Sequence, residues 1–143
     1  MGDSSVGVSK KRVMVDMSAT LIHHGHVRIL KAASELGAVI VALTTDEEIR
    51  TRKGYTPELN FSERREILEA IRYVDEVVPC AWLIDEAFLA RHNIDLLIHG
   101  DDNSNPIGPE RLHILRRTQG ISSSLLRSRV LKSIAQILEF RMQ

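Results

Sequence analysis

Three of the six histidines fall within four positions that also include a glycine: His23, His24, Gly25 and His26. Residues three apart share a helix face, so His23 and His26 would lie together at the start of a helix predicted to begin here. The free N–H groups and the positive dipole end of such a start attract anions, and glycine lets a ligand approach the backbone. Two imidazoles beside it can donate hydrogen bonds to phosphate oxygens. The cluster therefore indicates a phosphate-binding site.

Two other interpretations of the histidine cluster stay open. Surface histidines can lie close together by chance, or three imidazoles can bind a transition metal. The metal is disfavoured, because no carboxylate or cysteine lies nearby in the sequence to complete a tetrahedral ligand set. We therefore predict no metal site built by the protein itself. Two other common phosphate-binding motifs, GxxxxGK[ST] and GxGxxG, do not occur in the chain.

A second set of phosphate-binding residue types lies in the sequence RRTQGISSS, residues 116–124. Arg117 offers a fork of donors. The hydroxyls of Ser122 and Ser123, with free N–H groups at a helix start, can hold phosphate oxygens, and Gly120 permits close approach of a ligand. On these local features alone, a loop that ends in an N-cap serine is an equal alternative.

The elements that would position both clusters are short apolar runs alternating with longer helical patterns. This order predicts an α/β fold: a doubly wound, mostly parallel five-stranded sheet of Rossmann-like type with helices on both faces. Ligands of such sheets bind beyond the carboxyl ends of the strands, where the strand order reverses. The predicted strands are nearly continuous in apolar residues, as strands buried on both faces are. They are residues 12–15, 38–44, 76–78, 96–99 and 112–115.

Helices are predicted from apolar spacing and from capping residues. The first covers residues 25–36 and ends at Gly37, while Ser62 and Asp85 are the predicted N-caps of two further helices. Lys53 is expected in a loop that contains glycine and threonine. The last helix carries one apolar stripe that we expect to face the core, formed by Leu126, Val130, Ile134 and Ile137.

Composition limits the class of protein. The chain has 143 residues, of which 43% are hydrophobic and 27% charged, typical of one globular domain, here predicted over residues 12–143 after a flexible tail over residues 1–11. The 19 basic and 19 acidic residues give a net charge of zero, which argues against nucleic-acid and membrane partners. No apolar run approaches the ~20 residues of a membrane span. The single cysteine, Cys80, predicts a buried thiol and a reducing compartment such as the cytoplasm.

Several motifs in order, from about residue 12 to residue 130, identify a family. The chain resembles the cytidylyltransferases of the HxGH nucleotidyltransferase superfamily, in particular those that act on phosphocholine, phosphoethanolamine and glycerol phosphate. The matching residues are His23-x-Gly25-His26, Thr45-Asp46-Glu47, Lys53-Gly54, Glu63-Arg64, Arg72-Tyr73-Val74-Asp75-Glu76-Val77, His99-Gly100-Asp101-Asp102 and Arg117-Thr118-x-Gly120-Ile121-Ser122.

The resemblance implies transfer of CMP from CTP to a small phosphate or phosphonate monoester, with release of pyrophosphate. No covalent intermediate is expected, because the acceptor oxygen attacks the α-phosphorus in line. His23 and His26 would stabilise charge on the equatorial oxygens. Magnesium would arrive bound to the nucleotide. Two alternatives remain: an ATP-dependent adenylyltransferase of the same fold, and a catalytically idle nucleotide-binding module.

The resemblance also assigns expected roles to single residues. Lys53 would neutralise charge between the acceptor and the α-phosphate, and Arg64 would serve the phosphate end. Asp102 would contact the cytidine. The β- and γ-phosphates would be held by Arg117 with Ser122 and Ser123, in a nucleotide-binding set that also includes Gly25, Thr118, Gly120 and Ile121. Residues 72–77 are similar to a segment that helps relatives form a homodimer.

Three of these residues also have explanations that involve no ligand, and these stay open. Lys53 could simply be solvated, Arg64 could pair with Glu63 or Glu66 on an exposed helix face, and Asp102 could cap a turn.

The chain departs from the family pattern just before the histidines. Met17, Ala19 and Thr20 stand where relatives have glycine, an aromatic residue and aspartate. Losing the aspartate removes a negative charge near the reacting phosphates, so Thr20 bears on the choice of acceptor. The segment between Asp102 and Arg117 is shorter than in the choline and ethanolamine relatives, which implies a small acceptor. Trp82 resembles a tryptophan that faces the acceptor's ammonium group in choline-type relatives, although core packing or a partner surface is the favoured explanation.

Overall fold

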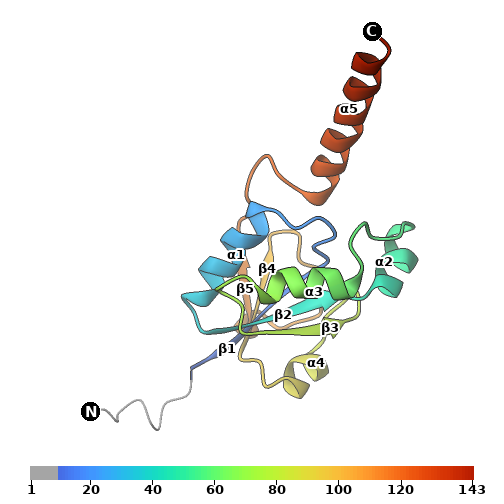
Figure 1. Cartoon of the computed structure of the whole chain (residues 1–143). Coiled ribbons are helices and arrows are strands. Elements are labelled where there is room, and N and C mark those ends of the chain that lie inside the picture. The colour runs from blue at the N-terminus through green and yellow to red at the C-terminus, as the bar shows by residue number, and fades with distance from the viewer. Residues whose placement is uncertain (1–9) are drawn as a thin grey trace.

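The computed structural model describes residues 10–143 and has a five-stranded parallel sheet at its centre (Figure 1). The strand order is β3-β2-β1-β4-β5, and every neighbouring pair is parallel. The chain builds outward from β1 to β3 and then returns to the other side of β1. The predicted doubly wound sheet is therefore confirmed, and the strand order reverses between β1 and β4. The strands are β1 (Arg12–Met17), β2 (Ala38–Thr44), β3 (Glu76–Cys80), β4 (Leu96–Gly100) and β5 (Leu112–Leu115).

Helices cover both faces of this sheet, as predicted. Alternate residues of a strand point to opposite faces, so Val13 and Val15 of β1 enter one core while Met14 enters the other. The first core packs under α1 (His24–Ser34) and α3 (Phe61–Glu69), and the second packs under α4 (Glu86–Arg91). The remaining helices are α2 (Asp46–Lys53), a 3₁₀ turn at Pro109–Arg111, and α5 (Ser123–Arg141).

The ends of α2 and α3 correct two details of the sequence prediction. Asp85 caps α4 as predicted, but the N-cap of α3 is Asn60 and not Ser62. Asn60 accepts from the amide of Glu63, whose carboxylate accepts from the amide of Asn60, both at 2.9 Å. Lys53 is not in a loop but ends α2, and Gly54 follows it with a left-handed φ of 80°.

Gly37 does not act as the predicted stop for α1. The helix ends at Ser34, with Glu35 as its C-cap. A Cβ at position 37 would lie 2.3 Å from the carbonyl oxygen of Lys11, which also accepts from the amide of Ala38 at 2.8 Å. Close approach of two backbone segments therefore explains this glycine. The predicted tail, residues 1–11, lies outside the described residues up to position 9, and Lys11 already belongs to the folded part.

The predicted core-facing stripe of α5 is wrong. Figure 1 shows α5 extending away from the sheet, and none of its residues is buried. Val130, Ile134 and Ile137 are each about half exposed, at 53%, 48% and 49%. Periodicity reports that a helix has an apolar stripe, but it does not say what that stripe packs against.

Cys80 is buried in the second core, as predicted, and burial raises the pKa of its thiol to about 12. Within residues 10–143, no helix combines the length and apolar character that a membrane crossing needs.

Candidate active site

A pocket of about 480 Å³ opens beyond the carboxyl ends of β1 and β4, where the strand order reverses. This is the place where doubly wound sheets bind ligands. The histidine cluster and the loop between β5 and α5, almost a hundred residues apart, both line it. The predicted site residues that line the pocket are Thr20, His23, Gly25, His26, Lys53, Trp82, Asp102, Arg117, Thr118, Ile121, Ser122 and Ser123.

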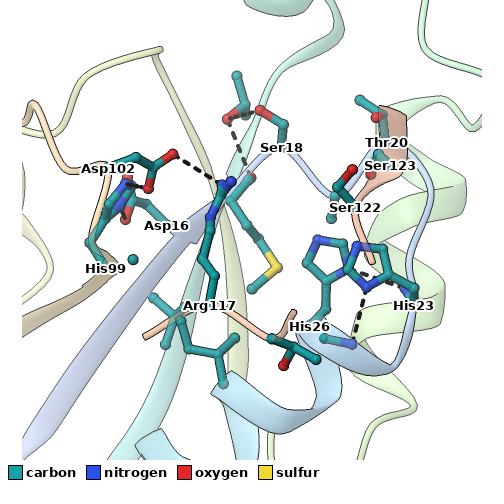
Figure 2. Close-up of a pocket in the computed structure, with 18 of the residues that line it drawn as sticks. Asp16, Ser18, Thr20, His23, His26, His99, Asp102, Arg117, Ser122 and Ser123 are labelled. Carbon is teal, nitrogen blue, oxygen red and sulfur yellow. Dashed lines mark hydrogen bonds and ion pairs between the residues drawn. The ribbon is translucent and has the colours of Figure 1, made fainter. Parts of the chain in front are cut away.

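The first turn of α1 orients the two imidazoles. His23 is the N-cap of α1, and its Nδ1 accepts a hydrogen bond from the amide of Gly25 at 3.0 Å. In return, Nδ1 of His26 accepts from the amide of His23 at 3.1 Å. Because both Nδ1 atoms are acceptors, the proton of each neutral ring is on Nε2. The ring centroids are 4.0 Å apart, and Figure 2 shows the two rings side by side near Ser122.

Both imidazoles are neutral near pH 7. Burial, followed by the charges of His23 and Arg117, lowers the pKa of His26 to about 3. Burial also lowers the pKa of His23, helped by His24 and Arg117. The site therefore presents two N–H donors without any charge of their own, beside a guanidinium that carries one.

The ring of His23, two positions earlier, requires glycine at position 25. A Cβ at position 25 would lie 2.8 Å from Cε1 of His23 and 3.3 Å from Cγ2 of Ile121. The His23 ring folds back over the glycine to reach its amide. The sequence analysis predicted glycine here for backbone access by a ligand. The space needed by the His23 ring is a second, local reason.

The start of α5 is tied to the loop that precedes the histidines. Ser122 caps α5 by accepting from the amide of Leu125 at 3.0 Å. The hydroxyl of Ser123 donates to the carbonyl of Leu21 at 3.0 Å and accepts from its amide at 3.2 Å. Ser123 therefore fixes the two pocket walls to each other. Gly120 does not line the pocket; its φ of 78° explains why glycine is there.

Arg117 and Asp102 belong to a chain of polar side chains (Figure 2), whose other members, His99, Asp16 and Asn105, the sequence analysis did not assign to the site. Nη2 of Arg117 lies 3.1 Å from Oδ2 of Asp102, and Nε2 of His99 lies 3.5 Å from Oδ1 of the same carboxylate. Nδ1 of His99 is 2.5 Å from Oδ1 of Asp16, whose Oδ2 accepts from Asn105 at 3.1 Å. Burial alone would lower the pKa of His99, but Asp16 and then Asp102 raise it above its ordinary value.

These hydrogen bonds bear on the expected magnesium. The two acidic residues that line the pocket, Asp16 and Asp102, already bind His99, Asn105 and Arg117. Within residues 10–143, no group of three or more His, Cys, Asp or Glu side chains could hold a metal ion. The donor set therefore does not fit an ion held by the protein.

Lys53 and Trp82 meet at the pocket wall. Nζ of Lys53 lies 5.4 Å from the centroid of the Trp82 ring, a cation–π distance. Trp82 belongs to neither described core cluster, so core packing does not explain it.

Arg64 does not reach the pocket, which corrects its expected role at the phosphates. The side chain is fully buried, and it is not paired with Glu63 or Glu66 either. Its guanidinium donates to the carbonyls of Ser18 (2.6 Å), Thr44 (2.9 Å) and Leu59 (3.0 Å) and to Asp46 (2.6 Å). Arg64 thus holds the ends of β1 and β2 in place.

The unusual residues before the histidines shape the same pocket. Met17 lines it, and Ala19 is buried with a φ of 47°, a left-handed conformation that costs an L-residue about 1 kcal/mol. Thr20, only 2% exposed, accepts hydrogen bonds from Tyr55 and from Arg127 of α5. Sequence reasoning missed Tyr55 and Arg127, because neither lies in a recognised motif.

The chain is similar in sequence to several cytidylyltransferases. The chain is 34% identical over 134 residues to an ethanolamine-phosphate cytidylyltransferase of Dictyostelium discoideum, a match that covers 84% of the chain and 36% of the relative. It is 31% identical over 125 residues to a glycerol-3-phosphate cytidylyltransferase of Bacillus subtilis (strain 168), covering 84% and 97%. Human choline-phosphate cytidylyltransferase A is 36% identical over 135 residues, covering 85% and 36%. The chain thus spans about a third of the ethanolamine and choline relatives.

A solved structure supports the fold. The lipopolysaccharide core biosynthesis protein from Thermoplasma volcanium GSS1 superposes with a TM-score of 0.59 at 20% identity, covering 87% of this chain and 88% of that one. Residues 18–129 match the cytidylyltransferase-like protein family. That match includes both halves of the pocket, and the chain belongs to the cytidylyltransferase-like family.

Proposed function

We propose that the protein transfers CMP from CTP to a small phosphate or phosphonate monoester and releases pyrophosphate. One observation carries this proposal: the neutral pair His23 and His26 and the Arg117–Ser122 loop line one pocket. A triphosphate is the type of ligand that needs both. The names of the relatives, which are phosphate cytidylyltransferases, support cytosine as the base and a phosphate monoester as the acceptor.

The reaction is an in-line displacement. A phosphate or phosphonate oxygen of the acceptor forms a bond to the α-phosphorus of CTP as the bond to the oxygen bridging the α- and β-phosphates breaks, and pyrophosphate leaves with that oxygen. The acceptor oxygen already carries negative charge, so no general base is required. Catalysis then depends on holding two anions in line and on stabilising charge at the equatorial oxygens.

The histidine pair supplies that stabilisation. The Nε2–H groups of His23 and His26 would donate to the equatorial oxygens of the α-phosphate. Neutral rings suit this role, because their hydrogen bonds strengthen as charge accumulates in the transition state. Lys53 would lie between the acceptor and the α-phosphate and reduce their mutual repulsion.

At the nucleotide end, Arg117 and the first turn of α5 would bind the β- and γ-phosphates. Asp102 would contact the cytidine and also hold the Arg117 guanidinium, to which it is paired at 3.1 Å. Magnesium would be bound by the nucleotide's own phosphates, in agreement with carboxylates that are already engaged.

Two features of the assembled protein belong to the same proposal. We infer a homodimer formed through residues 72–77, because β3 is an edge strand of the sheet and Arg72, beside it, is exposed. We also infer a cytoplasmic location, on the ground of the single buried cysteine.

The test is pyrophosphate release measured with CTP, ATP, GTP and UTP, each with phosphocholine, phosphoethanolamine, glycerol phosphate and aminoethylphosphonate. We expect turnover with CTP and one class of acceptor. Turnover with ATP and none with CTP would instead establish an adenylyltransferase. Tight CTP binding by calorimetry without pyrophosphate release from any acceptor would establish an idle nucleotide-binding module.

A further inference from the structure

Three segments far apart in sequence meet at one guanidinium, that of Arg127 in α5. Nε and Nη2 of Arg127 bind the two carboxylate oxygens of Glu58 at 2.5 and 2.9 Å, a bidentate pair. Nη2 also donates to Thr20 at 2.6 Å and to the hydroxyl of Tyr55 at 2.9 Å. The guanidinium carbon lies 4.4 Å from the Tyr55 ring centroid. Among residues 10–143, Nη1 of Arg127 makes no hydrogen bond.

This cluster lies on the wall of the active-site pocket. Thr20, Tyr55 and Arg127 all line it, whereas Glu58 does not. Glu58 therefore holds the guanidinium from behind, and Arg127 is available to a ligand from the front. The side chain of Arg127 keeps 26% of its surface exposed, consistent with a partly open donor.

The cluster is at the acceptor end of the pocket. Figure 2 shows Thr20 across the pocket from Asp102 and His99, on the side where the histidine pair also lies. Asp102 belongs to the nucleotide end in the proposed function. Tyr55 follows Lys53 by two residues, and Lys53 is the group proposed to lie between acceptor and α-phosphate.

Charge at this end disfavours an ammonium-bearing acceptor. Two cations, Lys53 and Arg127, line the wall, and the carboxylate of Glu58 is already bound bidentately. Nζ of Lys53 already lies over the Trp82 ring, 5.4 Å from its centroid. Thr20 brings no negative charge. An acceptor with an oxygen-bearing tail would instead find an unused N–H donor.

We propose that Arg127 is a specificity-determining residue whose Nη1 binds an oxygen at the non-reacting end of the acceptor. The acceptor is then a phosphate or phosphonate monoester with a hydroxyl or carboxylate tail, and not an alkylammonium. This inference rests on the proposed function for the identity of the reaction. The guanidinium of Arg127 is oriented by Glu58, Tyr55 and Thr20, so α5 contributes an N–H donor to the pocket although most of the helix extends away from the sheet.

The experiment measures acceptor binding and turnover separately. Calorimetry without nucleotide uses glycerol phosphate, 3-phosphoglycerate, phosphoethanolamine and phosphocholine, so that hydroxyl, carboxylate and ammonium tails are compared. The variants are Arg127→Gln, the conservative Arg127→Lys, and Lys132→Gln as an exposed control on the same helix. Pyrophosphate release with CTP then gives KM for CTP and for the acceptor.

We expect the wild type to bind a hydroxyl or carboxylate acceptor at least about tenfold more tightly than either ammonium acceptor, the effect of one charged hydrogen bond. Arg127→Gln should remove that preference, because it takes away the charged guanidinium donor and frees Glu58, and should leave KM for CTP within about twofold. Arg127→Lys should retain part of it, and Lys132→Gln all of it. Thermal melting of each variant checks that it folds.

Two results would overturn the inference: preference of the wild type for phosphocholine or phosphoethanolamine, or an unchanged acceptor preference in folded Arg127→Gln. Neither depends on turnover. Arg127-dependent acceptor binding without any CTP turnover would keep the acceptor site and overturn the proposed function, so the two failures are distinguishable.

Discussion

The sharpest test of the site is to remove one donor of the histidine pair and to separate its chemistry from its role in the fold. His26→Ala takes away the Nε2–H group and also the Nδ1 atom that accepts from the amide of His23 at 3.1 Å. Loss of one transition-state donor costs about 10²–10³-fold in kcat. Loss of the capping interaction costs about 1 kcal/mol in the free energy of unfolding.

His26→Gln separates the loss of kcat from the loss of stability. Glutamine at this third helical position can reach back to the N-cap amide, so most of the lost stability should return. The imidazole donor does not return, and kcat should stay reduced by about a hundredfold. The matched control is His24→Gln, since His24 is exposed and does not line the pocket. It should keep wild-type turnover.

The assays are urea unfolding for stability and pyrophosphate release at saturating CTP for kcat. A variant series in which kcat falls only in proportion to the folded fraction would refute a catalytic role for His26. Near-normal kcat in folded His26→Ala would do the same.

Three further outcomes test the surroundings of the site. The pKa of His99 is raised in the folded protein, so its pairing with Asp16 stabilises the fold below the ordinary pKa of histidine, and this stability is lost as pH rises through the folded value. The difference in free energy of unfolding between wild type and His99→Asn, measured by urea titration, should therefore decrease across that pH window. An increase in this difference would contradict the pairing. Arg64→Met should lower the free energy of unfolding by about 3 kcal/mol, because several buried acceptors lose their donor, and a loss under about 1 kcal/mol would refute this account. Gly25→Ala should reduce kcat by about tenfold or more through displacement of His23, although alanine normally favours a helix; unchanged kcat would show that the ring is not where the structure has it.

The parts that the sequence predicted well depend on local rules. The strands were found because runs buried on both faces are nearly continuous in apolar residues, and only their ends differ. β1 extends to Met17, and β3 extends through Pro79, which an edge strand tolerates because it needs no amide donor there. Two polar clusters that line the pocket were also predicted, because their residue types and spacing lie within a few positions.

The parts that it missed depend on distant partners. Arg64 is a charged residue on a helix, and nothing nearby in sequence shows that it is fully buried under the carbonyls that end β1 and β2. His99 belongs to a recognised motif, but its partner Asp16 is 83 residues away on another strand. Arg127 lies outside every motif. Only the parallel sheet brings such groups together.

The spacing of the HxGH motif itself follows from the first turn of a helix. An N-cap side chain and the side chain three positions later can each accept a backbone amide, and histidine does this through Nδ1 at both places. Position 25 must be glycine, because the His23 ring folds over it and its Cε1 lies 2.8 Å from where a Cβ would be. Each amide occupies Nδ1, so the proton of each neutral ring is on Nε2. The hydrogen bonds that start the helix thus also set the tautomer that the proposed mechanism requires, and a change that weakens the cap should weaken the proposed catalysis.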